Sequence, residues 1–302
     1  MGQVNIVAAT PGIEDLPRLL EVLSSWQIDP WVGHLHPGDI GWHSMVGTDR
    51  LMSDLRLWGS TGADPLAIAM VDGEVIRFAM DPGAVDDPSL AAVIARDLTH
   101  PETGIAREQG AVIEARGARA LRSHLLEDGW GEDDPWTPLS LDLAAAQLPP
   151  TDGEAAPLRV HPAQPEDARA WTAVHWSAFR GVDLDEETHQ VFTERWATMC
   201  TGPLAAFGHH LMGHDRRGAP AAVLSVWSAG AGRPALIEPL GVHRGHQGSG
   251  HGLAITTAAA RHLHLQGASS AVVVAENSNE AAMRTYRAAG FTAHEAVRDL
   301  TR

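Results

Sequence analysis

The chain of 302 residues suggests two domains, and its one cysteine excludes an internal disulfide. All 22 basic residues are arginine, which excludes chemistry that needs lysine, such as a Schiff base or a lysine-containing P-loop. The net charge of −16 argues against nucleic acid and membranes as partners, and with no signal peptide or apolar run of ~20 residues we expect a cytoplasmic location.

The first 145 residues show weak helix and strand patterns, which we assign to one domain. We expect helices near 14–25 and 118–127, and strands near 67–71, 74–80 and 111–114. Tryptophan and histidine gather between residues 26 and 58, where they either form a substrate wall or pack the core. These residues are Trp26, Trp31, Trp42, Trp58, His34, His36 and His43.

Residues 146–156 have the proline, glycine, aspartate and alanine composition of a linker, so a second domain is predicted from 157 to 302. The strands predicted there are 158–161, 208–212, 221–227, 235–242 and 271–275, and the helices are 164–179, 186–199, 253–266 and 280–289. Both halves end in a helix followed by glycine and an aromatic residue, which indicates an internal duplication.

The most informative motif lies where a predicted strand runs into the turn Gln247-Gly248-Ser249-Gly250-His251-Gly252 and a helix follows at once. Such a turn presents free backbone N–H groups and the positive end of a helix dipole to an anion such as pyrophosphate. A P-loop does not fit because lysine is absent, and a Rossmann fingerprint does not fit because the glycine spacing differs. The acyl-CoA loop pattern Gln/Arg-x-x-Gly-x-Gly/Ala matches at every fixed position.

A second motif follows in Asn279–Phe291, which reads NEAAMRTYRAAGF. It is similar to the N-x-x-A-x-x-x-Y-x-x-x-G-F signature of GNAT acetyltransferases. In this order the two motifs resemble the GNAT superfamily over residues 157–302. With the duplication, the resemblance implies an α+β tandem GNAT fold, in which each domain is a mixed, mostly antiparallel sheet flanked by helices.

The resemblance also implies acetyl-CoA, or another acyl-CoA, as co-substrate. Its pyrophosphate is expected at the glycine-rich loop, and the preceding strand is expected to contact the pantetheine arm and polarise the thioester carbonyl. The family usually has a bulge on that strand, for which Pro239 and Gly241 are local causes. The expected cofactor-binding residues are Leu240, Gly241, Val242, Gln247, Gly248, Ser249, Gly250, His251, Gly252 and Asn279.

Tyr286 is the only tyrosine in the chain and falls on the general-acid position of the family, with packing of the last helix as the alternative. Glu238 interrupts an apolar strand, so it is either the general base or an outward-facing residue. His175 on the first helix of this half is the second candidate base, or a packing histidine. No metal is expected, because the remaining histidine cluster lacks helical ligand spacing; it consists of His209, His210 and His214.

The N-terminal half has neither the glycine-rich loop pattern nor a tyrosine. Its segment Asp81–Pro88, which corresponds to the loop in the order of elements, carries three acids that would repel pyrophosphate. We therefore expect a degenerate domain without a cofactor site. Residues 1–150 hold nine arginines against 23 acids, whereas residues 151–302 hold 13 arginines against 15 acids. This distribution either attracts a cationic substrate or only keeps the surface soluble.

The function expected from these features is N-acyl transfer, most simply N-acetyl transfer, from acyl-CoA to a primary amine. The acceptor is expected to be a small, cationic molecule such as an amino sugar or a polyamine, which attacks the thioester directly in a ternary complex. The alternatives are a non-catalytic acyl-CoA-binding or regulatory protein, and a long-chain N-acyltransferase that acts on an antibiotic scaffold.

Overall fold

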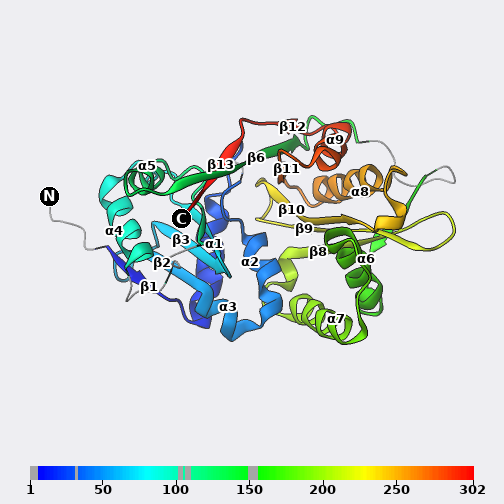
Figure 1. Ribbon diagram of the computed structural model, residues 1–302, viewed down its shortest axis with the longest axis horizontal. Helices are drawn as coiled ribbons and strands as arrows, with labels where there is room; N and C mark the ends of the chain where they lie inside the picture. The colour runs from blue at the N-terminus through cyan, green and yellow to red at the C-terminus, as the bar shows by residue number, and fades with distance from the viewer. Residues whose placement is uncertain (1–5, 31–32, 101–104, 106–109, 149–155) are drawn as a thin grey trace.

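The computed structural model describes residues 6–30, 33–100, 105, 110–148 and 156–302. Two lobes lie side by side, and one continuous sheet runs through both (Figure 1). The first lobe contains, in order, β1 (Val7–Ala9), α1 (Leu16–Ser25), α2 (Pro37–His43), α3 (Thr48–Asp54), β2 (Leu55–Gly59), β3 (Ala67–Asp72), β4 (Val75–Met80), α4 (Pro88–Thr99), β5 (Val112–Glu114), α5 (Arg119–Glu127) and β6 (Gly131–Asp142).

The second lobe repeats this order, with two helices instead of three after its first strand and one additional short strand, β12. It contains β7 (Arg159–Pro162), α6 (Ala168–Arg180), α7 (Glu186–Thr201), β8 (Gly208–His214), β9 (Pro220–Trp227), β10 (Ala235–Val242), α8 (His251–Leu265), β11 (Ser270–Glu276), α9 (Glu280–Ala288), β12 (Thr292–Ala293) and β13 (Val297–Thr301). Every strand and helix predicted for this half is present with small shifts of its ends. The helix predicted from residue 164 begins with a 3₁₀ turn, Pro165–Asp167, before α6.

The sheet has the strand order β1-β2-β3-β4-β5-β13-β6-β11-β10-β9-β8-β7, with β12 beside β6. Its pairs are antiparallel except for β4 with β5 and β10 with β11, which are parallel. The expected mixed, mostly antiparallel sheet is therefore confirmed. In each lobe the two parallel strands are connected along the chain by a helix: α4 follows β4 and precedes β5, and α8 follows β10 and precedes β11.

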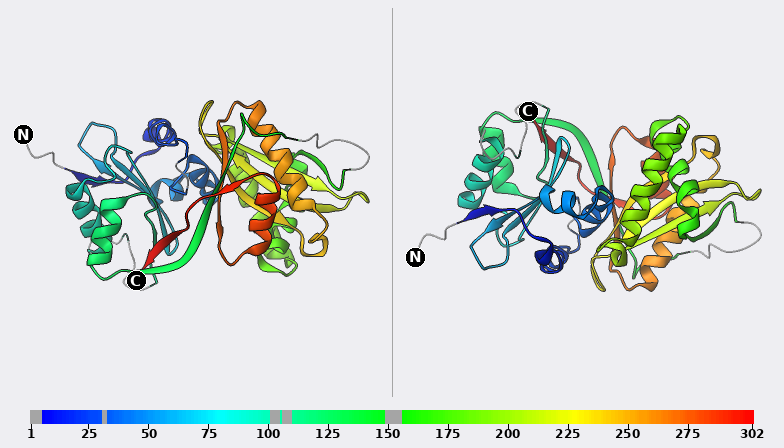
Figure 2. Two further views of the ribbon diagram at one scale, coloured as in Figure 1. Left: turned by 90° about the horizontal axis from the view of Figure 1, so that it is seen from above. Right: turned by 90° about the horizontal axis from the view of Figure 1, so that it is seen from below.

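The two lobes exchange their last strands. The long strand β6 leaves the first lobe and pairs with β11 of the second over Trp136–Asp142, while β13 at the end of the chain pairs with β5 of the first. Figure 2 shows both strands crossing between the lobes. The proposed boundary at 146–156 stays a prediction, and most of it (149–155) lies outside the described residues.

Helices cover both faces of the sheet in each lobe. In the first lobe α4 and α5 pack on one face and α1, α2 and α3 on the other. In the second lobe α8 and α9 pack on one face and α6 and α7 on the other (Figure 1). Over the described ranges, no helix has the length and apolar character needed to cross a bilayer.

Candidate active site

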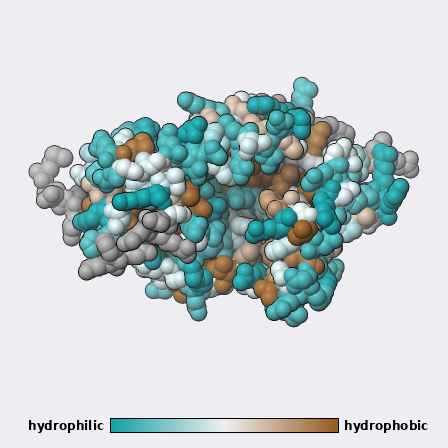
Figure 3. All heavy atoms as spheres, in the orientation of Figure 1, coloured by the Kyte–Doolittle hydropathy of each residue, from teal (hydrophilic) through white to brown (hydrophobic). Residues whose placement is uncertain are grey.

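The central cleft opens where two neighbouring strands separate. β10 and β11 pair only at Ala235 with Ala271 and at Leu236 with Val272, and beyond these residues the strands diverge. The gap is part of a cavity of about 390 Å³ that residues of both lobes line. On its other edge β10 stays paired with β9, with a bulge between Ile237 and Leu240, so the predicted bulge is confirmed. Figure 3 shows the surface hollowed between the lobes.

The bulge places Glu238 in this cleft. The indole Nε1 of the buried Trp227 donates a hydrogen bond to the Glu238 carbonyl at 2.7 Å, which fixes the backbone there. The side chain is half-buried and lines the cavity. Burial raises the pKa of the Glu238 carboxyl, and the charge of Arg77 opposes this rise. The structure thus excludes the outward-facing alternative for Glu238.

Asp39 of the first lobe faces Glu238, and the sequence analysis did not select it. Both side chains line the cavity, close enough for the charge of one to act on the other. Burial, reinforced by the charge of Glu238, raises the pKa of Asp39 to about 8. Two carboxyls this close cannot both ionise readily, so the pair tends to share one proton. The pair is therefore suited to accept a proton near neutral pH.

Close contacts fix the helix that carries Asp39. A Cβ atom on Gly38 or Gly41 would lie within 2.4 Å of Trp227, so only glycine allows α2 to approach β9 this closely. The Asp39 carboxylate accepts a hydrogen bond from the His36 backbone N–H at 2.6 Å, and His36 Nε2 lies 3.2 Å from the Pro234 carbonyl of the second lobe. Both lobes are thus needed to form the carboxyl pair.

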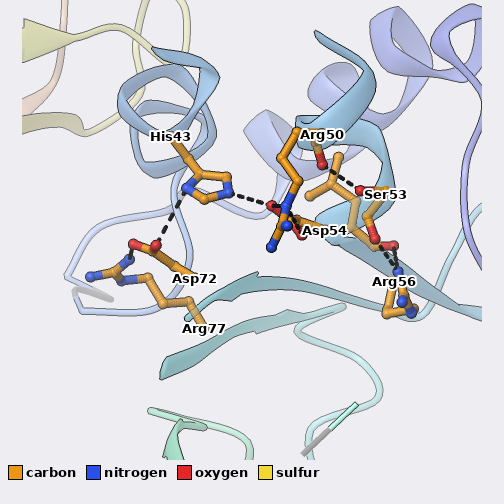
Figure 4. Close-up of polar contacts among 8 residues, drawn as sticks. His43, Arg50, Ser53, Asp54, Arg56, Asp72 and Arg77 are labelled. Carbon is orange, nitrogen blue, oxygen red and sulfur yellow. Dashed lines mark hydrogen bonds and ion pairs between the residues drawn. The ribbon is translucent and has the colours of Figure 1, made fainter. Parts of the chain in front are cut away.

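An ion-pair network supports the wall of the cleft on the first lobe (Figure 4). His43 of α2 lies 2.8 Å from Asp54 and 3.6 Å from Asp72, and Asp72 in turn lies 3.3 Å from Arg77. Arg77 also lies 3.3 Å from Glu114. The network ties α2 to α3, β3, β4 and β5, and so holds Arg77 in the lining of the cavity.

Tyr286 of α9 also lines the cleft and is only 5% exposed. Burial and the nearby charge of Glu238 raise the pKa of its phenol, so the group stays protonated at neutral pH. No described residue makes a hydrogen bond to its hydroxyl. The phenol is therefore free to donate a proton to a group in the cleft.

The predicted phosphate loop lies between β10 and α8, at the end of β10 that carries Val242. Gly248 and Gly250 have φ angles of 75° and 78°, which favour glycine. Among the described residues, nothing accepts a hydrogen bond from the backbone N–H groups of residues 248–253. These donors and the start of α8 fit a pyrophosphate group.

The other predicted cofactor-binding residues surround this loop and the cleft. Gly241 lies against α6, where an added Cβ would be 3.0 Å from Ala178. Asn279 caps α9 by accepting a hydrogen bond from the Ala282 N–H at 3.0 Å, and it lines the cleft together with Leu240. Gln247 and Ser249 are exposed, whereas His251 is buried at the start of α8. Their contacts with a cofactor stay predictions.

Replacing Gly250 by alanine tests the loop. A left-handed conformation costs an alanine ~1–2 kcal/mol, so the variant should shift the loop and raise the dissociation constant of acetyl-CoA about tenfold. Gly73→Ala is the matched control, because Gly73 has φ 66° in the turn between β3 and β4 and, like Gly250, has nothing within 4 Å of an added Cβ. Calorimetry should show unchanged acetyl-CoA affinity in Gly73→Ala; equal loss in both variants would contradict this role of the loop.

The corresponding helix of the first lobe starts differently. Asp87 caps α4 by accepting hydrogen bonds from the backbone N–H groups of Ser89 and Leu90, at 2.8 and 3.2 Å. Asp86 forms an ion pair with Arg119. A carboxylate thus takes the place that an anionic ligand would need, which gives a physical basis for the expected lack of a cofactor site in this lobe.

His175 does not line the cleft. It lies in a neighbouring aromatic pocket, stacked on Trp171 with ring centroids 5.5 Å apart, and burial lowers its pKa to about 4. The three other histidines have different neighbours: His209 contacts His262, His210 contacts Trp227, and His214 stacks on His161. Within the described part of the chain, no cluster of three potential metal ligands is found.

Of the tryptophan and histidine residues of the first lobe, some pack in the core and others line a pocket. Trp26 and Trp58 are buried in the core, whereas His34 and His36 line the cleft and Trp42 lines the aromatic pocket. His43 belongs to the ion-pair network. Trp31 lies outside the described residues.

Comparisons with known proteins agree with this geometry. The model of the acetyltransferase (GNAT) family matches residues 168–291. The mycothiol acetyltransferase of Streptomyces avermitilis is 32% identical over 162 residues, which are 51% of this chain and 47% of that protein, so the match spans about half of its length.

Solved structures extend the likeness to both lobes. A tandem GNAT protein from the clavulanic acid biosynthesis pathway superposes with a TM-score of 0.61 at 17% identity, covering 99% of this chain and 98% of that one. A GCN5-related N-acetyltransferase from Sphaerobacter thermophilus gives a TM-score of 0.57 at 17% identity, over 98% and 95% of the two chains. The second lobe therefore matches the GNAT acetyltransferase family model, and the whole chain has the fold of the tandem GNAT protein.

Proposed function

We propose that the protein is an N-acyltransferase, most simply an N-acetyltransferase, which moves the acyl group of acyl-CoA to a primary amine by direct attack in a ternary complex. The observation that carries this proposal is the position of Tyr286, Glu238 and Asp39 around one cleft, beside a loop with free backbone donors. The first lobe binds no CoA in this proposal but supplies one wall of the cleft.

The residues of the cleft suit each proton transfer. The ammonium proton of the acceptor passes to the Glu238–Asp39 pair, whose raised pKa values make it a suitable base. The amine nitrogen then bonds to the acyl carbon as the carbon–sulfur bond breaks. Tyr286 donates its proton to the departing thiolate, and the second proton of the nitrogen restores the Tyr286 phenol. The edge of β10 that faces the gap, near Leu240, offers backbone N–H groups to the thioester oxygen.

The thiol product provides the direct test of the proposed function. Free CoA released from acetyl-CoA should increase above the hydrolysis background for at least one member of a panel of primary amines. The panel should include amino sugars, polyamines and amino acids, and longer acyl-CoA donors should be compared. Binding of acetyl-CoA without release of CoA for any amine would favour the non-catalytic acyl-CoA-binding alternative.

One acyl-CoA should bind per chain. The N-terminal end of α8 has free donors, whereas Asp87 occupies that of α4. Titration calorimetry should therefore give a stoichiometry of one. Two equivalent sites per chain would contradict the assignment of the cofactor to the second lobe.

The acceptor is proposed to present a cationic ammonium to the cleft. Four acids line the cavity against two arginines, so negative charge is in excess even while the Glu238–Asp39 pair holds one proton; the residues are Asp39, Glu114, Glu238 and Glu276, with Arg77 and Arg116. Salt screens such attraction over ~10 Å at 0.1 M. The KM of the acceptor should therefore rise severalfold with ionic strength, and the KM of acetyl-CoA should rise less. An acceptor KM that does not change with salt would contradict electrostatic attraction.

A further inference from the structure

A second cavity adjoins the catalytic cleft. It has a volume of about 380 Å³ and lies between α6, α7 and the C-terminal end of α2. Phe179 lines both this cavity and the cleft. Asp39 and Trp42 also connect them, because they are three residues apart on α2 and such residues are neighbours on a helix surface. A ligand that reaches the carboxyl pair can therefore extend into this cavity, which we call the aromatic pocket.

Flat rings form the walls of the aromatic pocket. The His175 ring lies 5.4 Å from Trp42, 4.6 Å from Phe179 and 5.2 Å from Phe192, measured between ring centroids. Trp176 completes the lining on α6. Walls of this kind favour a planar ligand group, which stacks on the rings or meets them edge to face.

Two unpaired cations stand at the same pocket. The guanidinium of Arg180 lies over the Trp176 ring at 5.5 Å from its centroid, and Arg195 approaches from α7. Neither arginine forms an ion pair with any described carboxylate, whereas Arg169, also on α6, pairs with Glu186 at 2.5 Å. A free guanidinium fork matches the geometry of a carboxylate.

The pocket also holds two buried polar atoms without partners. Neither Trp176 Nε1 nor His175 Nδ1 has a hydrogen-bond partner among the described residues. Buried polar atoms are normally satisfied, so these two leave unused hydrogen-bonding capacity in the wall of the pocket. The low pKa of His175, about 4, keeps its ring uncharged at neutral pH.

We propose that the aromatic pocket binds the far end of the amine acceptor, and that this end is a planar group carrying a carboxylate. This inference rests on the proposed function and adds to it the class of acceptor: an amine at one end, with an aromatic acid at the other. The adenosine 3′-phosphate of CoA is also planar and anionic, so the experiment has to separate the two sources.

The probe is 2-naphthoate, an aromatic carboxylate without an amine. Calorimetry should show that it binds the wild-type protein, and that the exchange of both Arg180 and Arg195 for glutamine weakens binding at least tenfold. The matched control is Arg169→Gln, which removes an exposed arginine of α6 outside the pocket and should leave binding unchanged. Thermal melting shows whether the variants are folded.

Competition identifies the source of the bound group. Naphthoate should compete with the amine that gives the highest activity and not with acetyl-CoA, and adenosine 3′,5′-bisphosphate should not displace it. Equal binding to the wild type and the double variant, or competition with acetyl-CoA, would overturn the proposal. The calorimetric step needs no turnover, so a failure of the proposed function and a failure of the pocket assignment give different results.

Discussion

Replacing Tyr286 by phenylalanine should lower kcat by about 100-fold or more, because general acid catalysis typically contributes that much. The ring fills the same buried space beside Phe291, 5.4 Å away between centroids, so packing is kept. Acetyl-CoA affinity and melting temperature should stay near those of the wild type. Turnover at the wild-type rate, with chemistry shown to limit it, would contradict the acid role.

Replacing Glu238 by glutamine should lower kcat/KM by about 100-fold or more, because the amine then loses its proton acceptor. Glu276→Gln is the matched control, since Glu276 lines the same cleft and its exchange removes the same charge. That control should change kcat/KM much less. An equal loss in the two variants would show that Glu238 acts only through its charge on the acceptor.

The pH dependence belongs to the same prediction. The carboxyl pair must lose a proton to act as base, so kcat/KM should fall as the pH decreases through the pKa of the pair. Burial raises the pKa of both carboxyls above the usual range, and the charge of Glu238 raises that of Asp39 further. In Asp39→Asn the carboxyl whose pKa is about 8 is absent, so the fall should move to lower pH. An unchanged pH dependence of kcat/KM would show that Asp39 does not take part in accepting the proton.

The second lobe was predictable because its signals are local. The strand, glycine turn and helix around Gly250 and the signature ending at Phe291 lie within short segments, and the structure has the elements where these patterns place them. The bulge at Glu238 and Pro239 also follows from local sequence, since proline cannot donate to a ladder. The family resemblance then supplied the role of Tyr286.

The exchanged strands were not predictable in this way. β6 begins with Gly131 and three acids and contains Pro135 and Pro138, which hide its strand character. Its partners β11 and β13 lie more than 120 residues further along the chain. Register between such distant segments depends on packing that no local pattern expresses.

Asp39 was not predicted from the sequence, because its role also depends on a contact between distant segments. Its neighbours in sequence indicate only a helix start, and its partner Glu238 lies 199 positions away. His175 was selected because its residue type suits a base. However, α6 places it in the aromatic pocket, and it does not line the cleft. Which candidate enters the cleft depends on the exchange of strands and the docking of α2 on Trp227.

The central claim is direct acyl transfer in the cleft between the lobes. The most direct test incubates the protein with acetyl-CoA and the amine that releases the most CoA, and quantifies free CoA, N-acetylated amine and the mass of the intact protein together. We predict one acetylated amine per CoA released, no acyl-protein adduct, and loss of both products in Tyr286→Phe. An acetyl group retained on the protein, or CoA release without acetylated amine, would contradict the account.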